Sequence, residues 1–312
     1  MNAVALTPER RRARRRAAWR RRRLVLLLMS PWIVGFAVFF AYPLISNAYL
    51  SFTHYDLLSH PRWIGTSNYE FLFEKDPSIW PAVKNTLWLV AIMVPLQVVF
   101  AIGVAMALQR ARRGVGFFRT VFYLPRMTPV VATAAIFFLL LNGNTGAVNQ
   151  FLGVFGIEGP QWLVDPTWIK PSIVLMQLWA VSGTMVIFLA ALKNVPRELY
   201  EVASLDGAGP VRRFFSITLP MISGAMFFNV IVLTIAAFQV FDSAYLLFWR
   251  DESNASPEAA LFYAVYLFQQ AFRQFNFGFA AAMAWLLFVI LLLLTLIQVK
   301  IGNRFVYYEG GR

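Results

Sequence analysis

The sequence contains no cysteine and only two histidines among its 312 residues. Without thiols the chain forms neither disulfides nor thiolate metal sites, and His54 and His60 have no further ligand at metal-binding spacing. No lysine follows a glycine, so a phosphate-binding P-loop is missing, and nothing supports a Ser–His–Asp arrangement. We therefore predict no catalytic residue, no metal site and no cofactor, and a protein that is not an enzyme.

Charged residues are also scarce, at 14% of the sequence, whereas 59% of the residues are hydrophobic and the mean hydropathy is +0.60. A soluble globule could not bury that much apolar surface. Six apolar runs reach the roughly 20 residues that a helix needs to cross a bilayer. They lie at about 24–49, 83–108, 121–141, 173–192, 222–241 and 280–299. We predict an all-α, polytopic integral membrane protein with six transmembrane helices.

Several of the runs contain prolines (Pro31, Pro95, Pro125 and Pro129), which are tolerable inside a span because neighbouring helices can satisfy the freed backbone groups. A further apolar stretch, Ala259–Phe272, is too short for a span. We expect that stretch to be interfacial or packed against other helices.

The distribution of Lys and Arg predicts the orientation. Basic residues gather in segment 1–23 and again at 110–119, 193–213 and 300–312. Because basic loops stay on the cytoplasmic side, we predict that both termini are cytoplasmic. The segment 1–23 is then a basic tail that lies against anionic membrane lipid rather than nucleic acid, and the membrane domain occupies 24–312.

Acidic residues are missing from the interior of the runs. All 15 Asp and Glu lie in tails or loops, with Asp242 at the end of the fifth run. Ion-coupled carriers generally keep ionisable groups inside the bilayer, so the energy for any transport must come from outside this chain. Arg126 is the only charged residue well inside a run, where it either extends towards the cytoplasm or lines a translocation path.

A charged segment, ELYEVASLDGAGPVRRFFSITLP, separates the fourth and fifth runs at 198–220. Pro196 suits the first turn of a helix, and Gly207 suits the left-handed residue at its end. Pro210 then opens a second helix, which Pro220 interrupts. This helix–turn–helix is suited to docking into a groove of a partner, although an ordered interfacial loop without a partner has the same pattern.

The same segment resembles the cytoplasmic loop signature of the permease subunits of binding-protein-dependent ABC importers. That signature is Glu-Ala-Ala, three residues, Gly, nine residues and Ile-x-Leu-Pro, and only Val202 departs from it. The sequence is similar to the carbohydrate-uptake branch (maltose, lactose and glycerol-3-phosphate permeases) from Leu24 onwards. The resemblance implies that loop 193–221 couples to an ATPase through Glu198, Glu201, Ala203, Asp206, Gly207, Ile217, Leu219 and Pro220.

The resemblance also implies the partners and the location. The chain would be one half of an importer for a sugar, an oligosaccharide or a glycerol-phosphate-like solute in the bacterial inner membrane. Its partners would be a second, homologous permease, a pair of ATP-binding subunits and an extracytoplasmic solute-binding protein. Two other classes stay open. One is an ATP-independent channel or facilitator for a small polar solute, and the other is a sensor or anchor that uses the basic tail as an interaction arm.

The solute path has five candidate residues. Sugar sites offer aromatic faces to the ring, and amides or hydroxyls to its hydroxyl groups. Within the last three runs such side chains are Gln177, Trp179, Asn229, Gln239 and Trp285. They do not share one helical stripe, since Asn229 and Gln239 lie about 80° apart on a helical wheel. A single Trp or Asn in a span also commonly packs against another helix.

Overall fold

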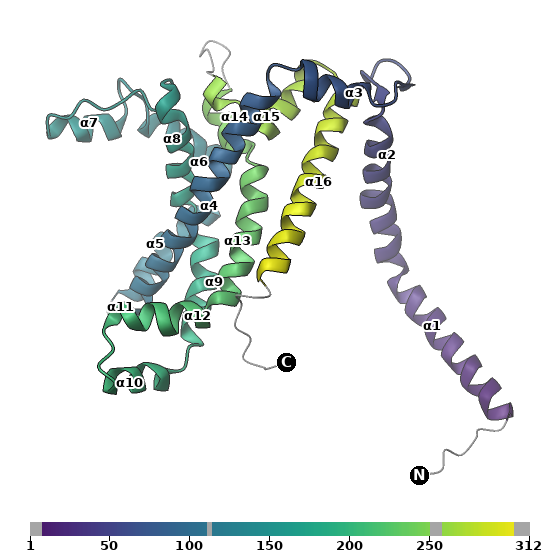
Figure 1. Cartoon of the computed structure of the whole chain (residues 1–312), viewed down its shortest axis with the longest axis horizontal. Coiled ribbons are helices and arrows are strands. Elements are labelled where there is room, and N and C mark those ends of the chain that lie inside the picture. Colours follow the sequence, from purple (N-terminus) through teal and green to yellow (C-terminus); the bar gives the residue numbers. More distant parts are fainter. Residues whose placement is uncertain (1–7, 111–113, 250–257, 303–312) are drawn as a thin grey trace.

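The computed structural model describes residues 8–110, 114–249 and 258–302, and these are almost entirely helical (Figure 1). The long helices run from one end of the molecule to the other. A helix satisfies its own backbone hydrogen bonds, as any segment that crosses a bilayer must. The described residues also form one antiparallel ribbon, in which Thr53 of β1 (Thr53–His54) pairs with Trp63 of β2 (Arg62–Trp63). The predicted helical class is therefore confirmed.

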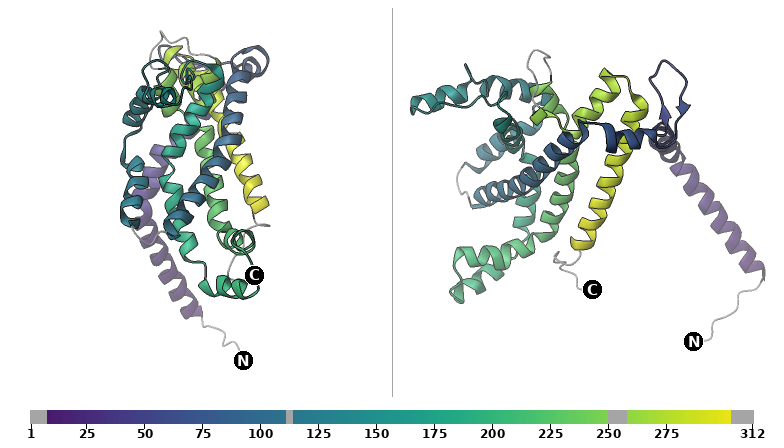
Figure 2. Two further views of the ribbon diagram at one scale, coloured as in Figure 1. Left: turned by 90° about the vertical axis from the view of Figure 1, so that its left-hand side faces the viewer. Right: turned by 45° about the horizontal axis from the view of Figure 1, so that its top comes forward.

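The first apolar run belongs to a helical rod that already begins inside the basic segment. The rod consists of α1 (Pro8–Phe36), the π-helical turn η1 (Ala37–Ala41) and α2 (Tyr42–Leu50). Near the upper end α2 meets α16, but α1 diverges from the other helices (Figures 1 and 2). None of the 18-residue apolar stretch in this rod is buried. Its surface is therefore left uncovered by the described chain.

The helix α4 (Ile79–Arg110) is the centre of the bundle and corresponds to the predicted second span. It packs against α8, α9 and α13. Ala101 and Ala105 have no exposed surface, and together with Phe188 of α9 they belong to one buried cluster. Such small residues let two helices approach closely within a membrane. The core of the bundle is thus built around α4.

The third predicted span is broken. It forms α5 (Val115–Met127) and α6 (Val130–Leu140), which meet at an angle of 104°. The break lies at Thr128, which has φ −83° and ψ 126° because it precedes Pro129. The predicted run 121–141 is therefore interrupted by a sharp bend, and it counts as a single span only if the bent pair crosses as one unit.

Two further predicted spans are also interrupted. The fourth consists of α8 (Pro166–Trp179) and α9 (Ser182–Lys193), which are bent by 50°. The fifth, predicted at 222–241, contains α13 (Ser223–Phe238) and ends in the non-helical residues 239–241, after which α14 (Asp242–Phe248) begins. The sixth, α16 (Phe277–Gly302), is unbroken. Four described stretches are long and apolar enough to cross a membrane, or six if each of the two bent pairs counts as one span.

The short stretch Ala259–Phe272 forms η4 (Glu258–Ala260), α15 (Tyr263–Phe268) and part of η5 (Gln269–Arg273). It packs against α4 and α16 at the upper end of the bundle. The Tyr263 hydroxyl donates to the Met283 carbonyl oxygen at 2.8 Å, and the Tyr266 hydroxyl donates to the Asp76 carboxylate at 2.7 Å. The stretch therefore packs against other helices, as one of the two expectations has it, whereas an interfacial position stays a prediction.

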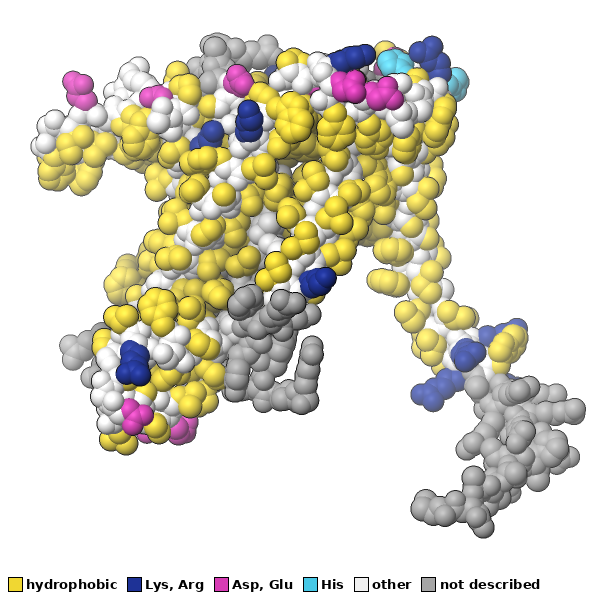
Figure 3. All heavy atoms as spheres, viewed as in Figure 1, with side chains coloured by type: hydrophobic (Ala, Val, Ile, Leu, Met, Phe, Trp, Pro, Cys, Tyr) yellow, Lys and Arg dark blue, Asp and Glu magenta, His cyan; other side chains and the backbone are white. Residues whose placement is uncertain are grey.

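The remaining elements lie at the two ends of the bundle. The upper end carries α3 (Ser67–Glu70), η2 (Phe71–Lys75) and the projecting α7 (Ala147–Val154). The start of α1, the α10–α12 segment and the end of α16 share the lower end (Figure 1). Figure 3 shows charged side chains gathered at both ends and hydrophobic side chains over the middle. This distribution matches a molecule that crosses a bilayer.

Candidate functional site

Two helical segments extend below the bundle and correspond to the helix–turn–helix expected at 198–220 (Figure 1). They are α10 (Arg197–Leu205) and a second helix made of α11 (Pro210–Arg213), the π turn η3 (Phe214–Thr218) and α12 (Leu219–Met221). Two boundaries differ from expectation. Pro196 stands one residue before α10, and Pro220 lies inside α12, so that the helix breaks at Ile222 instead. A π turn just before a proline accommodates its missing N–H.

The bend between the two helices is a Schellman turn. Gly207 has φ +73°, as the sequence predicts. The Gly207 N–H donates to the Ser204 carbonyl oxygen at 3.1 Å, and the Ala208 N–H donates to the Ala203 carbonyl oxygen at 2.9 Å. These two bonds satisfy carbonyl groups that a helix end otherwise leaves free. The chain therefore turns at a defined point.

Side chains also fix the two helices to each other. Arg213 Nε donates to the Ala208 carbonyl oxygen at 2.7 Å, and its Nη1 donates to Ser204 Oγ at 2.9 Å. The hydroxyls of Tyr200 and Thr218 lie 2.9 Å apart. A charged guanidinium makes stronger hydrogen bonds than neutral groups do. The helix–turn–helix is thus a braced unit and not a loose loop.

The outer face of α10 carries apolar side chains in the open. The exposed fraction is 41% for Leu199, 57% for Val202 and 89% for Leu205. The residues that the resemblance assigns to ATPase coupling divide into two sets: Ala203, Ile217 and Leu219 are partly buried, whereas the exposed ones are Glu198, Glu201, Asp206, Gly207 and Pro220. Exposed apolar and acidic groups on a rigid support are suited to a protein partner.

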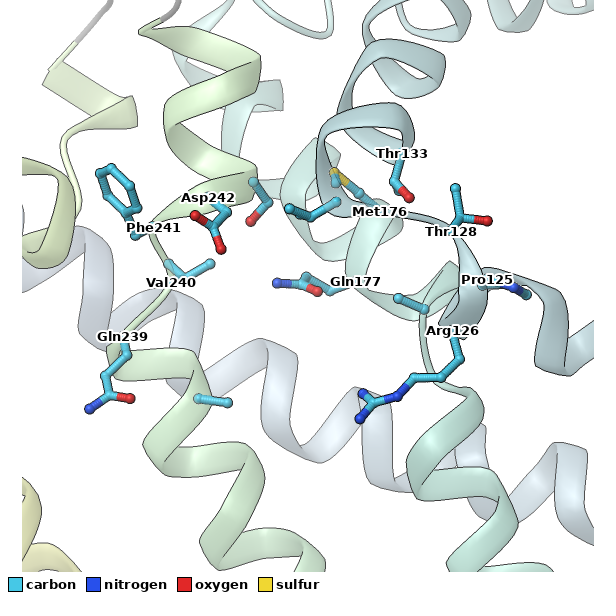
Figure 4. A pocket seen from close by; sticks show the side chains of 14 residues that line it. Pro125, Arg126, Thr128, Thr133, Met176, Gln177, Gln239, Val240, Phe241 and Asp242 are labelled. Carbon is cyan, nitrogen blue, oxygen red and sulfur yellow. The ribbon is translucent and has the colours of Figure 1, made fainter. Parts of the chain in front are cut away.

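A cavity of about 290 Å³ lies where the three broken helices are interrupted (Figure 4). Residues next to each of the three breaks contribute to it. Its lining consists of Pro125, Arg126, Thr128, Val130, Thr133, Met176, Gln177, Ala180, Ala236, Gln239, Val240, Phe241, Asp242 and Ser243. Polar side chains therefore converge at one place among otherwise apolar helices.

The cavity contains two of the five candidate path residues, Gln177 and Gln239. Trp179 instead lines an apolar cavity of about 460 Å³ and meets the Phe137 ring edge-on at 5.8 Å. Asn229 is 2% exposed and donates to the Ala225 carbonyl oxygen at 2.8 Å within its own helix. Trp285 stacks edge-on against Phe288 at 5.2 Å and does not line this cavity. These three residues are not brought together with the glutamines.

The cavity also contains polar residues that are not among the five candidates. Arg126, which the sequence leaves between two roles, lines it, and so does Asp242 (Figure 4). Thr128 and Thr133 add hydroxyls. The sequence signal that could have identified them is the Thr128–Pro129 pair, which predicts an interruption of the third span. Polar groups near an interruption of a membrane helix commonly line a site.

Broken apolar helices around a polar cavity, with a braced helical pair outside the bundle, are the arrangement expected of a membrane transport permease. Residues 97–307 match the family model described as the binding-protein-dependent transport system inner membrane component. The chain belongs to this family. The match covers α4 from its middle, α5–α15 and the whole of α16.

Curated relatives agree with this assignment. The chain is 40% identical to the probable ABC transporter permease protein YesP of Bacillus subtilis over 90% of this chain and 91% of the relative. It is 30% identical to the arabinooligosaccharides transport system permease protein AraP of Bacillus subtilis (88% and 87%), and 31% identical to the lactose transport system permease protein LacF of Rhizobium radiobacter (86% and 91%).

A solved structure has the same fold. It is a chain of a bacterial ABC transporter involved in the import of the acidic polysaccharide alginate. The TM-score is 0.81 and the sequence identity is 24%, with 94% of this chain and 100% of that chain covered. A second structure of the bacterial alginate ABC transporter, in complex with an alginate pentasaccharide-bound periplasmic protein, gives a TM-score of 0.80 at 22% identity.

Proposed function

We propose that this chain is one of two permease subunits of an ATP-driven ABC importer in the bacterial inner membrane. The solute is a sugar, an oligosaccharide or a glycerol-phosphate-like molecule. Relatives named for arabinooligosaccharides, lactose and sulfoquinovosyl glycerol support a carbohydrate. ATP is hydrolysed by a partner, because this sequence has no P-loop.

The observation that carries this proposal is the braced helix–turn–helix at 198–220. It holds exposed Leu199, Val202 and Leu205 at the lower end of the bundle, where they need a partner surface. In an importer, this partner is an ATP-binding subunit. Closure of the ATPase pair then draws the two permeases' coupling helices together, and the attached spans switch between inward- and outward-facing states. The free energy enters as a difference in binding to these two states.

The uncovered first rod supports pairing with a second permease. The 18-residue apolar stretch within Trp19–Leu50 contains no buried residue, and a homologous permease in the same membrane offers helices to cover it. The elements at the upper end then face the extracytoplasmic solute-binding protein. The start of α1, the end of α16 and the α10–α12 segment then face the cytoplasm, as the basic residues around them favour.

The polar cavity is this chain's share of the solute path. Gln177, Gln239, Thr128 and Thr133 provide amide and hydroxyl groups for the ring hydroxyls of a sugar. The cavity lies at two bent helix pairs and beside the interruption at 239–241, so that a change at any of these points alters its shape. A path built at such breaks can open to one side at a time.

Reconstitution in liposomes tests the proposal. The chain alone is expected to show neither ATPase activity nor uptake against a gradient. Addition of the second permease, the ATPase pair, ATP and a loaded binding protein restores accumulation, and the binding protein stimulates hydrolysis because it favours the state in which the ATPase closes. Concentrative uptake by the chain alone, driven by a proton or sodium gradient, refutes the importer. Rapid passive flux by the chain alone indicates a channel instead.

A further inference from the structure

Two charged side chains face the polar cavity, and each stands next to a helix interruption. Arg126 is the second-last residue of α5, just before the break at Thr128, and Asp242 is the first residue of α14. In Figure 4 the two side chains lie on opposite sides of Gln177. Among the described residues neither takes part in a hydrogen bond or an ion pair. The cavity therefore holds a cation and an anion that are both available to a ligand.

An unpaired arginine at this depth requires an explanation. Ionisable groups within membrane spans are costly and generally face a bundle interior or a water-filled cavity, where they mark a pathway. The guanidinium is always charged and presents a planar fork of donors that matches a carboxylate in two parallel hydrogen bonds. A neutral sugar hydroxyl uses only one arm of that fork. The chemistry of Arg126 therefore favours an acidic group on the solute.

The other polar groups of the cavity favour a saccharide body. Gln177, Thr128 and Thr133 supply amide and hydroxyl groups, and Asp242 accepts hydrogen bonds from hydroxyls. Because Asp242 repels a second anion, the acidic group of the ligand lies at the Arg126 end and its hydroxyls face Asp242. A volume of about 290 Å³ is close to the lower end of small-molecule sites, about 300–1,000 Å³.

We propose that the cavity selects a saccharide that carries a carboxylate, such as a uronate residue, and that Arg126 binds this carboxylate while Asp242 orients the hydroxyls. This inference rests on the proposed role of the cavity as the solute path. It makes Arg126 a specificity-determining residue. If the Arg126 side chain instead extends towards the membrane surface, Arg126 has no influence on the choice of solute.

The test measures direct binding to the complete importer in lipid nanodiscs without its binding protein, so that the specificity of that protein does not interfere. The probes are methyl glycosides of glucuronate, galacturonate and mannuronate, each compared with the methyl glycoside of the matching neutral hexose. Saturation-transfer NMR detects weak binding. At least one uronate is expected to bind about tenfold more tightly than its neutral counterpart, as a charge-assisted hydrogen bond pair implies.

Four variants separate charge from structure. Arg126→Gln is expected to weaken uronate binding by about ten- to a hundredfold and to change neutral binding by less than about threefold. Arg126→Lys keeps the charge but loses the fork, and it gives an intermediate value. Asp242→Asn removes both an acceptor for the ligand hydroxyls and the repelling anion, so it is expected to weaken the binding of neutral hexosides more than the binding of uronates. Arg119→Gln is the matched control, because Arg119 lies two turns earlier on α5 and outside the cavity lining.

Several outcomes overturn the inference. One is equal binding of uronates and neutral hexosides, another is a uronate preference that survives Arg126→Gln, and a third is the lack of binding by every probe. If uronates and neutral sugars bind equally and Gln177→Ala weakens both, the acidic selectivity is refuted while the importer and its path stand. If no probe binds and the reconstituted importer accumulates no solute, the proposed function itself is refuted.

Discussion

A substitution at Gly207 tests whether the helix–turn–helix at 198–220 docks to the ATPase, because it changes only the backbone conformation at the bend. The Gly207 φ of +73° lies in the left-handed region, and a Cβ built on this glycine meets no atom within 4 Å. An alanine at 207 therefore causes no clash, but it places an L-residue in a conformation that costs roughly 1–2 kcal/mol. Gly209, two residues later, has equally open surroundings with an ordinary φ of −68°. It is the matched control.

The cost sets the expected size of the effect. A penalty of about 1–2 kcal/mol reduces the population of the bent segment relative to alternatives by about 5- to 30-fold. If the ATPase subunits bind only the bent form, Gly207→Ala weakens their affinity for the permease pair by that factor. Gly207→Val is worse because it is β-branched, and Gly207→Asn is milder because Asn tolerates the left-handed region. Gly209→Ala leaves the affinity unchanged.

The assay is equilibrium binding of the purified ATPase pair to the permease pair in nanodiscs, with ATP-driven uptake measured in parallel. Equal expression and insertion of all variants are verified first. The expected order of affinity is wild type and Gly209→Ala, then Gly207→Asn, Gly207→Ala and Gly207→Val. Equal affinities for Gly207→Val and wild type contradict the reasoning, because the bend is then unimportant for docking. A loss with Gly209→Ala as large as that with Gly207→Ala contradicts it too.

Two further predictions concern stability and topology. Tyr266→Phe removes the donor to Asp76, whose exposed fraction is only 5%, and this costs about 1–3 kcal/mol; a lower midpoint in fluorescence-detected thermal unfolding is expected, and an unchanged midpoint argues against a stabilising bond. Single cysteines at Ser59 and Gln274 react with an impermeant thiol reagent in intact cells, and a cysteine at Leu205 does not, because the first two lie at the upper end of the bundle and the third at the lower end. Labelling of position 205 from outside contradicts the orientation.

The sequence was sufficient where local chemistry decides the structure. Gly207 and Pro210 fix the end of one helix and the start of the next, because a left-handed glycine and a first-turn proline act within a few residues. The six apolar runs were likewise recognisable from hydropathy. The length of Ala259–Phe272 was enough to predict that it is not a span. Its packing against α4 depends on hydrogen bonds from distant residues, such as Asn85 to the Leu261 carbonyl oxygen.

The cavity was harder to predict, because it is formed where helices are interrupted and not by the long apolar stretches themselves. Hydropathy does not distinguish a straight span from α5 and α6, whose angle depends on the extended backbone at Thr128. Asp242 follows the end of the fifth apolar run, and only the interruption at 239–241 brings it to the cavity. The sequence could have shown that Trp179 and Gln177 do not face the same site, because side chains two residues apart point about 200° apart around a helix.

The three interruptions have a consequence for water. Each break leaves backbone carbonyl and N–H groups without helical partners, and in hydrocarbon such groups are tolerated only inside protein or along a hydrated space. The cavity of about 290 Å³, with its two charged side chains, is therefore expected to be hydrated. A wet pocket within a bilayer conducts small ions as soon as it is continuous with both surfaces. If the cavity is the proposed solute path, the breaks that form it oblige the transporter to keep at least one side sealed at every moment.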